Sequence, residues 1–464
     1  MNLKPKHLLL AIVTTALISC IITASLVLST TTTSTFYISG GIYPGAPAYT
    51  VWAEADGNYY AKDANGLIAF YGTNGTTVIQ SALDGLTVGR TWKEKVVLKG
   101  LFTLTNPILI SSDTILDIQG EIIIPVSMVD YLYLISNKDH VLGNVNIEIL
   151  NGRIDGNLSS DHATPTTMPT DGLRPIRLYA VQNLTIDNVE VYCSPTYGIE
   201  LARIGNVGCE RAIITRCRIY NAWYDGIICD NAGQVQISNN IVEYTAFRSG
   251  LGDSISAYNG SSSVIITNNW VRWGNGSGIG VVSSVKGITA FVTVSGNLVY
   301  DCDGAGILVS PESAAEDNRT IDVSITGNTL YYNAWGIMLQ FVSGVTVSGN
   351  VIAGSTYSGI WANTSDCLSI VGNSIYNNAE NGGDYQGITI LDSDSIGVLI
   401  SSCNVIDDRV APTQIGIKIA PSVVNCTIIG CSVLKAKTYG IWDGGTGTKI
   451  GHCWNGSTYI AAYP

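Results

Sequence analysis

The sequence has few charged residues: Lys, Arg, Asp and Glu make up 13% of its 464 residues, and the formal net charge is −12. Binding to nucleic acid phosphates requires clustered Lys and Arg, so this deficit argues against a nucleic acid partner. It argues equally against binding to an anionic membrane surface. A neutral glycan, or a polyanion bridged by a divalent cation, is compatible with the composition.

The eleven cysteines include no Cys-x-x-Cys pair, which argues against a zinc site. Long apolar runs are also scarce. One, from about Leu8 to Leu28, follows Lys4 and Lys6 and reaches the length needed to span a bilayer. Residues 1–35 are therefore predicted to be a signal-anchor helix in the membrane or a cleaved signal peptide, followed by a Ser/Thr tether. A lipid-modified Cys20 is a weaker alternative, and all three predict an extracellular or cell-surface location.

What the sequence does contain is a repeated frame. Each repeat has a short alternating strand, an Asn or Cys at a turn, a second short strand, a polar loop, and a small residue before Ile. The small residues are Gly198, Gly226, Ser254, Gly278, Gly306, Gly336, Gly359, Gly387, Gly416 and Gly440. Their spacing varies from 23 residues (Gly336 to Gly359) to 30 (Gly306 to Gly336). Three short strands in such a period predict an all-β, right-handed parallel β-helix of about 10–13 coils.

Parallel stacking also explains a column of Asn at one turn, whose side-chain amides can bond along the helix axis. The column comprises Asn240, Asn269, Asn297, Asn328, Asn350 and Asn373, with Cys217, Cys403, Cys431 and Cys453 in the same place. Neighbouring coils lie about 4.8 Å apart, which allows either disulfides or small apolar plugs at these cysteines.

The exposed end of such a stack needs a cover. Residues 76–86 predict a short helix with Val78, Ile79, Ala82 and Leu83 on one face. We therefore expect an N-terminal hairpin and cap in residues 36–100 and the coils in residues 101–464.

This arrangement resembles the pectin lyase-like β-helix superfamily over about residues 70–455, and the polygalacturonase-like family 28 glycoside hydrolases most. Asn151–Asn157 and Arg174–Leu201 look like early coils of that family. Asp225-Gly226-Ile227 stands where the family has Asn-Thr-Asp-Gly-Ile, and Gly252-Asp253 where it has Asp-Asp. The resemblance implies a polysaccharide hydrolase or lyase with Asp225 and Asp253 as catalytic residues. Gly252 and Ser277 replace a family aspartate and histidine.

The frame itself places Asp225 and Asp253 at the same position of adjacent coils, about 5 Å apart. When two carboxyl groups lie this close, repulsion between their negative charges raises the pKa of one of them. One group is then protonated and the other ionised, as glycosidic cleavage requires. The spacing suits a retaining pair better than an inverting one, which needs about 6.5–9.5 Å. Two alternatives remain open: Asp before a small residue is ordinary turn chemistry, and both residues with Asp230 could form a Ca²⁺ site. No other cofactor is expected.

Aromatic residues in the same coils are candidate sugar platforms, or rings that merely stabilise the stack. They are Trp223, Tyr258, Trp273, Trp335 and Trp361. His162, in a long loop, is a candidate acid or base, and Arg248 could offset the charge of Asp253. The sequence therefore predicts a secreted or surface-tethered β-helix that binds or cleaves polysaccharide. The alternative is a non-catalytic adhesin or envelope protein.

Overall fold

A computed structural model describes residues 46–125, 132–156, 172–247, 252–313, 318–380, 386–392, 395–408, 415–436, 439–454 and 459–460. The chain divides into two units, Met1–Pro44 and Gly45–Pro464, and all described residues belong to the second. The predicted apolar segment, His162 and Arg248 lie outside the described residues. Over the part of the chain that is described, no helix has the length and apolar character needed to cross a membrane.

The described unit begins with a small antiparallel sheet and one helix. The elements are β1 (Tyr49–Ala53), β2 (Tyr59–Asp63), β3 (Ile68–Gly72), α2 (Gly75–Asp84), β4 (Glu94–Thr103), β5 (Ile108–Ile110) and β6 (Thr114–Ile123). Asn74 caps α2, because its side chain accepts a hydrogen bond from the Thr77 backbone N–H. The predicted helix face is buried, so the capping helix is confirmed. Strand β1 pairs in parallel with β4, which joins this cap to the coils.

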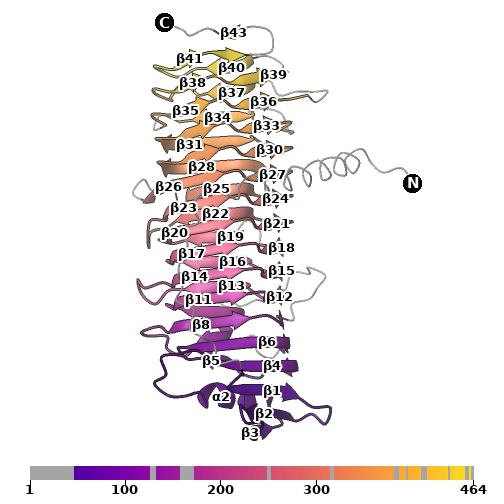
Figure 1. The fold of residues 1–464 in the computed structure, drawn as a ribbon. Helices are drawn as coiled ribbons and strands as arrows, with labels where there is room; N and C mark the ends of the chain where they lie inside the picture. The colour runs from indigo at the N-terminus through magenta and orange to yellow at the C-terminus, as the bar shows by residue number, and fades with distance from the viewer. Residues whose placement is uncertain are drawn as a thin grey trace, which may run out of the picture. The chain divides into compact units, whose positions relative to one another are not determined.

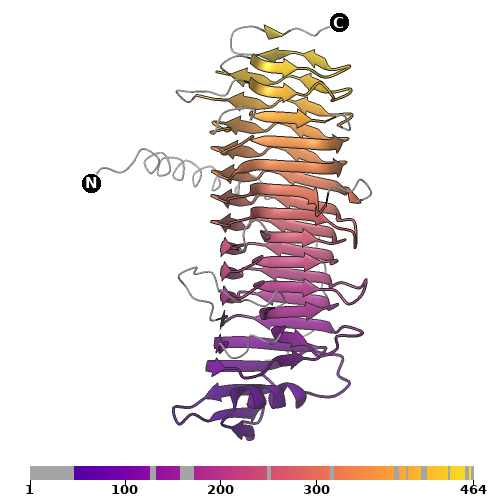
Figure 2. The ribbon, with the colours of Figure 1, turned by 180° about the vertical axis from the view of Figure 1, so that it is seen from behind.

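From β7 onward the strands fall into three columns, and each coil contributes one strand to each column (Figures 1 and 2). The first sheet contains β7 (Tyr133–Asn137), β10 (Arg174–Tyr179), β13 (Ile199–Ala202), β16 (Ile227–Asp230), β19 (Asp253–Tyr258), β22 (Ser277–Ser283), β25 (Ala305–Pro311), β28 (Trp335–Ser343), β31 (Ile360–Asp366), β34 (Ile388–Leu391), β37 (Ile415–Ile419) and β40 (Tyr439–Asp443).

The second sheet contains β8 (Val145–Leu150), β11 (Gln182–Asp187), β14 (Glu210–Thr215), β17 (Gly233–Ser238), β20 (Ser262–Thr267), β23 (Ala290–Ser295), β26 (Thr320–Thr326), β29 (Thr346–Ser348), β32 (Ser369–Val371), β35 (Leu399–Ser401), β38 (Thr427–Ile429) and β41 (Lys449–Gly451). The third sheet contains β9 (Arg153–Asp155), β12 (Glu190–Ser194), β15 (Arg218–Ala222), β18 (Ile241–Thr245), β21 (Trp270–Arg272), β24 (Leu298–Tyr300), β27 (Thr329–Tyr331), β30 (Val351–Ala353), β33 (Ser374–Tyr376), β36 (Asn404–Ile406), β39 (Ser432–Leu434) and β42 (Cys453–Trp454). Strand β43 (Tyr459–Ile460) pairs antiparallel with β42.

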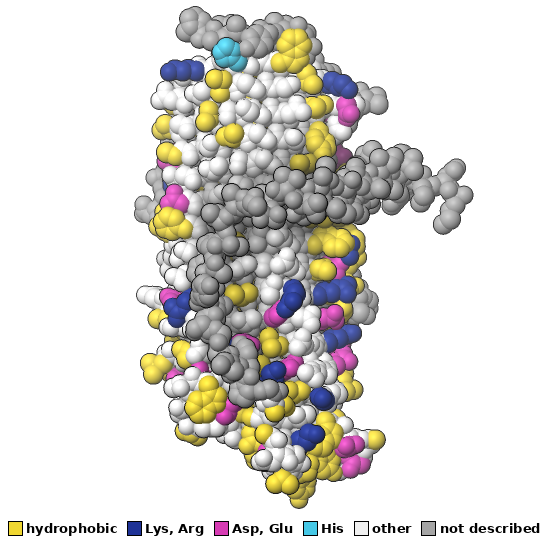
Figure 3. All heavy atoms as spheres, viewed as in Figure 1, with side chains coloured by type: hydrophobic (Ala, Val, Ile, Leu, Met, Phe, Trp, Pro, Cys, Tyr) yellow, Lys and Arg dark blue, Asp and Glu magenta, His cyan; other side chains and the backbone are white. Residues whose placement is uncertain are grey.

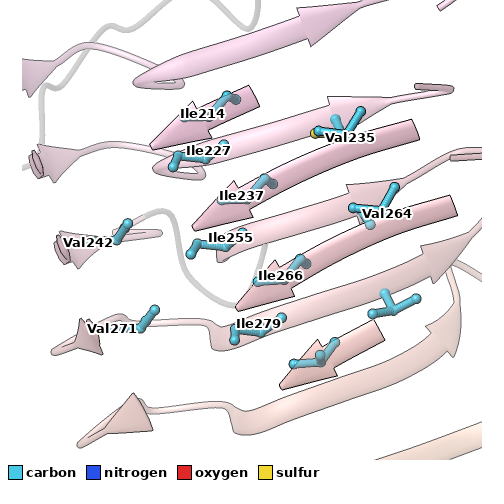
Figure 4. Packing of buried hydrophobic residues seen from close by; sticks show 14 of the residues in the cluster. Ile214, Ile227, Val235, Ile237, Val242, Ile255, Val264, Ile266, Val271 and Ile279 are labelled. Carbon is cyan, nitrogen blue, oxygen red and sulfur yellow. The ribbon is translucent and has the colours of Figure 1, made fainter. Parts of the chain in front are cut away.

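Within each sheet a strand pairs in parallel and in register with the strand one coil away. Ile227, for example, lies opposite Ile255, which lies opposite Ile279. Figure 4 shows these side chains stacked in inward-facing columns, and all three are fully buried. Burying one such side chain contributes about 1.5–3 kcal/mol, so the stacked apolar columns are the main source of stability. The predicted parallel β-helix is confirmed.

The Asn column forms a continuous hydrogen-bonded ladder between the second and third sheets. The Asn297 Nδ2 donates to the Ile266 carbonyl at 2.9 Å and to the Asn328 Oδ1 at 3.0 Å. Its Oδ1 accepts from the backbone N–H and the Nδ2 of Asn269. Cysteines extend the column: the Cys431 Sγ donates to the Ile400 carbonyl as an Asn amide would. Every cysteine that the structure describes is an unpaired thiol, so these are hydrogen-bonding rungs and not disulfides.

Candidate functional site

Asp225 and Asp253 occupy the corner that leads into the first sheet, just before β16 and at the start of β19. The two residues lie in adjacent coils, and the Asp253 backbone N–H donates a hydrogen bond to the Asp225 Oδ1 at 3.1 Å. The Asp253 carboxylate in turn accepts hydrogen bonds from the backbone and hydroxyl of Ser277 in the next coil. Each carboxylate therefore accepts a hydrogen bond from the residue that occupies the equivalent position in the next coil.

Glycine makes room for both carboxylates. A Cβ on Gly252 would lie 2.7 Å from the Asp225 Oδ1, and the φ of Gly252 is +126°, which L side chains rarely adopt. A side chain at position 252 would therefore collide with the Asp225 carboxylate. A Cβ on Gly280 would lie 1.8 Å from the Asp253 Oδ2. Ile279 and Val281 face inward, so Gly280 between them faces outward. The Asp253 carboxylate occupies the space where a Gly280 side chain would be, and it therefore lies on the outer side of the sheet.

Both carboxyl groups are nonetheless covered, with exposed fractions of 4% for Asp225 and 8% for Asp253. Burial raises the pKa of Asp225 well above its ordinary value, and the nearby negative charges of Asp253 and Glu200 add to the shift. Burial likewise raises the pKa of Asp253, partly offset by its hydrogen bonds to Ser277. Among the described residues, neither carboxylate forms an ion pair with a basic side chain. The pair is therefore expected to hold at least one proton near neutral pH.

One coil before Asp225 lies a buried ion-pair cluster around Glu200, which the repeat pattern did not predict. Glu200 in β13 lies 2.9 Å from the Arg174 Nε and 3.0 Å from the Arg177 Nε. Arg174 also lies over the ring of Tyr197, which occupies the same corner position as Asp225. Arg174 and Arg177 share the Glu200 carboxylate, and it is the negative charge of Glu200 that reaches Asp225 and adds to its raised pKa.

Asp230 lies at the far end of β16 from Asp225. Its carboxylate accepts a hydrogen bond from the Asn259 Nδ2 at 2.8 Å and lies 3.6 Å from the Arg203 Nε. Asp230 and Tyr258 are directly opposite in the pairing of β16 with β19. No group of three or more His, Cys, Asp or Glu side chains within the described ranges could hold a metal ion. The three aspartates of the predicted Ca²⁺ site thus do not come together there as one ligand set.

The predicted aromatic platforms are scattered. Trp223 is buried against Cys193, so it offers no surface to a sugar. Trp335 shares the corner column of Asp253 and stacks on Tyr357 with ring centroids 4.3 Å apart. Trp361 lies on the outer face of β31, farther along the first sheet. Tyr258 lies opposite Asp230, at the far end of β19 from Asp253, and burial and Glu312 raise its pKa.

Trp273 belongs to a different group of rings, on the third sheet. It packs against Tyr244 with ring centroids 4.7 Å apart, and the Arg272 guanidinium lies 3.9 Å from its ring centroid. The signal for this group was present in the sequence, because an aromatic residue follows several ladder asparagines by three or four positions. Tyr244 follows Asn240 in this way, and Tyr300 follows Asn297.

The family model for a right handed beta helix region matches residues 143–321 and 292–454, which is more than half of the chain. The chain belongs to this family of right-handed β-helix proteins. No curated protein matches the sequence at a significant level.

Several solved structures share the fold at low sequence identity. The A-module of the mannuronan C-5 epimerase AlgE6 of Azotobacter vinelandii is 15% identical, with a TM-score of 0.59, over 84% of this chain and 96% of that one. A tailspike protein of Escherichia coli bacteriophage HK620, in complex with a hexasaccharide, is 13% identical, with a TM-score of 0.58, over 84% and 78%. Gene product 12 of bacteriophage phi29 is 14% identical, with a TM-score of 0.62, over 84% and 56%. At such identities the likeness establishes the fold alone.

Proposed function

We propose that this protein acts on polysaccharide by cleaving glycosidic bonds at the Asp225 and Asp253 pair. The observation that carries the proposal is the placement of two carboxyl groups at the same corner of adjacent coils, linked by the hydrogen bond from the Asp253 N–H to the Asp225 Oδ1 and each with a raised pKa. Because the two carboxyl groups titrate as a pair, one keeps its proton and is the donor to the leaving oxygen, and the other ionises first and serves as base or nucleophile.

Other observations support a glycan as the ligand. The ring of Tyr197, at the same corner position one coil before Asp225, can cover an apolar sugar face, and the Arg174 guanidinium lies over that ring. Among structures with this fold, one is a polysaccharide epimerase by name and one holds a hexasaccharide. The apolar run near the N-terminus supports a location outside the cytoplasm, at the cell surface or secreted. Cell fractionation with N-terminal sequencing of the mature protein tests that part.

One observation favours a second candidate, a non-catalytic glycan-binding or envelope protein. Both carboxylates are less than 10% exposed, and each bonds to the backbone of the next coil, which is a structural role. In this alternative the aspartates fix the corner, and the surface around them only binds.

Assays for reducing ends and for unsaturated products over a panel of polysaccharides separate the two candidates. Wild-type protein is compared with Asp225→Asn, Asp253→Asn and Asp303→Asn. Asp303 is exposed and precedes a glycine in a loop of the same kind, so it is the matched control. Cleavage lowered at least about 100-fold in the first two variants and unchanged in the third supports catalysis. Equal cleavage in all four proteins refutes it, and binding without cleavage by folded wild-type protein selects the second candidate.

A further inference from the structure

The outer face of the third sheet carries a run of aromatic rings that the proposed site does not use. One ring comes from each of six consecutive coils, and together they are called the aromatic stripe: Tyr192, Tyr220, Tyr244, Trp273, Tyr300 and Tyr332. Each ring lies in, or directly after, a strand of the third sheet, and these strands (β12, β15, β18, β21, β24 and β27) follow one another along the helix axis (Figure 1). All six side chains are partly exposed, so the stripe is a surface and not part of the core.

The rings contact one another for most of this length. Tyr192 and Tyr220 have centroids 5.6 Å apart, and Tyr220 and Tyr244 have centroids 5.2 Å apart. Tyr244 continues to Trp273, and Tyr300 packs on Tyr332 at 5.7 Å. The Trp273 backbone N–H donates to the Tyr300 carbonyl, which places the two halves in adjacent coils. A linear polymer that lies along the helix axis would therefore meet a ring at every coil.

The charges beside the stripe are compensated locally. Glu243, whose side chain is only 1% exposed, receives hydrogen bonds from Arg272 and from the Arg218 Nη2 at 2.9 Å. Arg272 also covers Trp270, which is 40% exposed, at 4.3 Å from the ring centroid. The Arg218 and Arg272 guanidiniums thus bond to a buried carboxylate while lying over aromatic rings of this face.

At the N-terminal end of the stripe, carboxylates outnumber guanidiniums. Arg153 lies 4.0 Å from the Tyr192 ring centroid and pairs with Glu121 and Asp155. Glu190 is opposite both Arg153 and Arg218 in the strand register. Figure 3 shows basic, acidic and hydrophobic side chains gathered along this edge of the molecule, on the side where Figure 1 labels β12 to β21. The face therefore carries no excess positive charge, and the whole chain has a net charge of −12.

From these observations we infer that the aromatic stripe is a second glycan-binding surface, and that its ligand is an uncharged linear polysaccharide lying along the helix axis. Rings partly exposed at each coil cover the apolar faces of sugars. Compensated arginines and carboxylates bind hydroxyl groups, whereas the four carboxylates and three guanidiniums in and beside this face leave no net positive charge to attract a polyanion. This surface is on the third sheet and the aspartate pair is on the first, so the inference does not depend on cleavage by Asp225 and Asp253.

Tryptophan oxidation of the wild-type full chain tests the surface without any substitution. N-bromosuccinimide modification is followed by mass spectrometry with hydroxyethyl cellulose, galactomannan or dextran present, and in parallel with polygalacturonate. A neutral polymer is expected to slow modification of Trp270 and Trp273 and to leave Trp361, on the first sheet, unchanged. Protection of Trp361 instead, protection by polygalacturonate alone, or no protection by any neutral polymer overturns the inference.

Affinity electrophoresis in gels containing the protecting polymer then tests individual rings. We expect Trp273→Leu and Trp270→Leu to bind about tenfold more weakly, a loss of about 1.4 kcal/mol, and Trp361→Leu to bind as wild type does. Asp225→Asn is also expected to bind normally, which separates a failure of this inference from a failure of the proposed cleavage. Thermal unfolding of each variant shows whether it is folded. Because Trp270 is exposed, its variant is expected to fold even if Trp273→Leu does not, and normal binding by folded Trp270→Leu overturns the inference.

Discussion

Replacing Asn297 with Ala removes a buried amide in the middle of the ladder, and the structure allows the cost to be worked out. The Asn297 side chain is 1% exposed and is the acceptor, at 2.9 Å, for the backbone N–H of Asn269. Without the Asn297 side chain that buried N–H has no hydrogen-bond acceptor, which costs about 1–3 kcal/mol. The lost amide bonds to the Ile266 carbonyl and to Asn328 cost about 1 kcal/mol each. The free energy of unfolding should therefore fall by about 3–5 kcal/mol.

Two variants provide the comparison. Asn297→Cys introduces the residue that the chain itself uses at Cys217 and Cys403, whose Sγ atoms donate to carbonyls at 3.6 Å, so we expect a smaller loss. Asn275→Ala changes an exposed residue and should stay within about 0.5 kcal/mol of wild type.

Urea unfolding followed by circular dichroism measures the global effect in these variants. Hydrogen exchange of the peptide that contains Asn269 measures the local one, since that amide loses its acceptor. If Asn297→Ala unfolds at the same urea concentration as Asn275→Ala and the Asn269 amide stays protected, the ladder contributes no net stability and the reasoning is wrong.

Three further predictions concern the charged groups. The folded-state pKa values of Asp225 and Asp253 lie above their unfolded values, so the folded protein binds more protons and loses stability as pH rises from about 4 through neutrality. Asp253→Asn should therefore melt higher than wild type at pH 8 and about equally at pH 4, and a larger advantage at pH 4 contradicts this. Glu243→Gln leaves two arginines without their shared carboxylate and should lower the melting temperature by about 1–3 °C; an unchanged value argues against the ion pairs. Gly280→Ala should destabilise the wild type more than it destabilises Asp253→Ala, because the added Cβ collides with the Asp253 carboxylate; equal effects in the two backgrounds in a double-mutant cycle rule out that contact.

The repeat frame predicted much of the fold because one rule is applied in every coil. An inward Ile after a small residue fixes the register, so the sequence alone placed Asp225 and Asp253 at equivalent positions of adjacent coils. It also predicted the ladder, because Asn recurs at the same turn of successive coils and its amide can bond to the coil beside it. The helix cap followed from the apolar face of residues 76–86.

The candidate site was less predictable because exposure depends on neighbours that the frame does not specify. The carboxylate of Asp253 fits on the outer face only because residue 280 has no side chain, and no pattern within its own coil shows this. Trp223 looked like a sugar platform, yet packing against Cys193 buries it. The Glu200 cluster was missed because its arginines come from the preceding coil.

The strands of each coil pair only with those of the coil before and the coil after. The number of coils can therefore change without disturbing the remaining pairs. A whole coil inserted or removed would find the same partners at the new junction, since Ile227, Ile255 and Ile279 present equivalent surfaces. The two aspartates do not share that freedom. An extra coil inserted between β17 and β18 would leave both corners intact and yet separate Asp225 from Asp253. The stack as a whole can therefore vary in length between related proteins, whereas this one junction must keep its spacing for the carboxyl groups to act together.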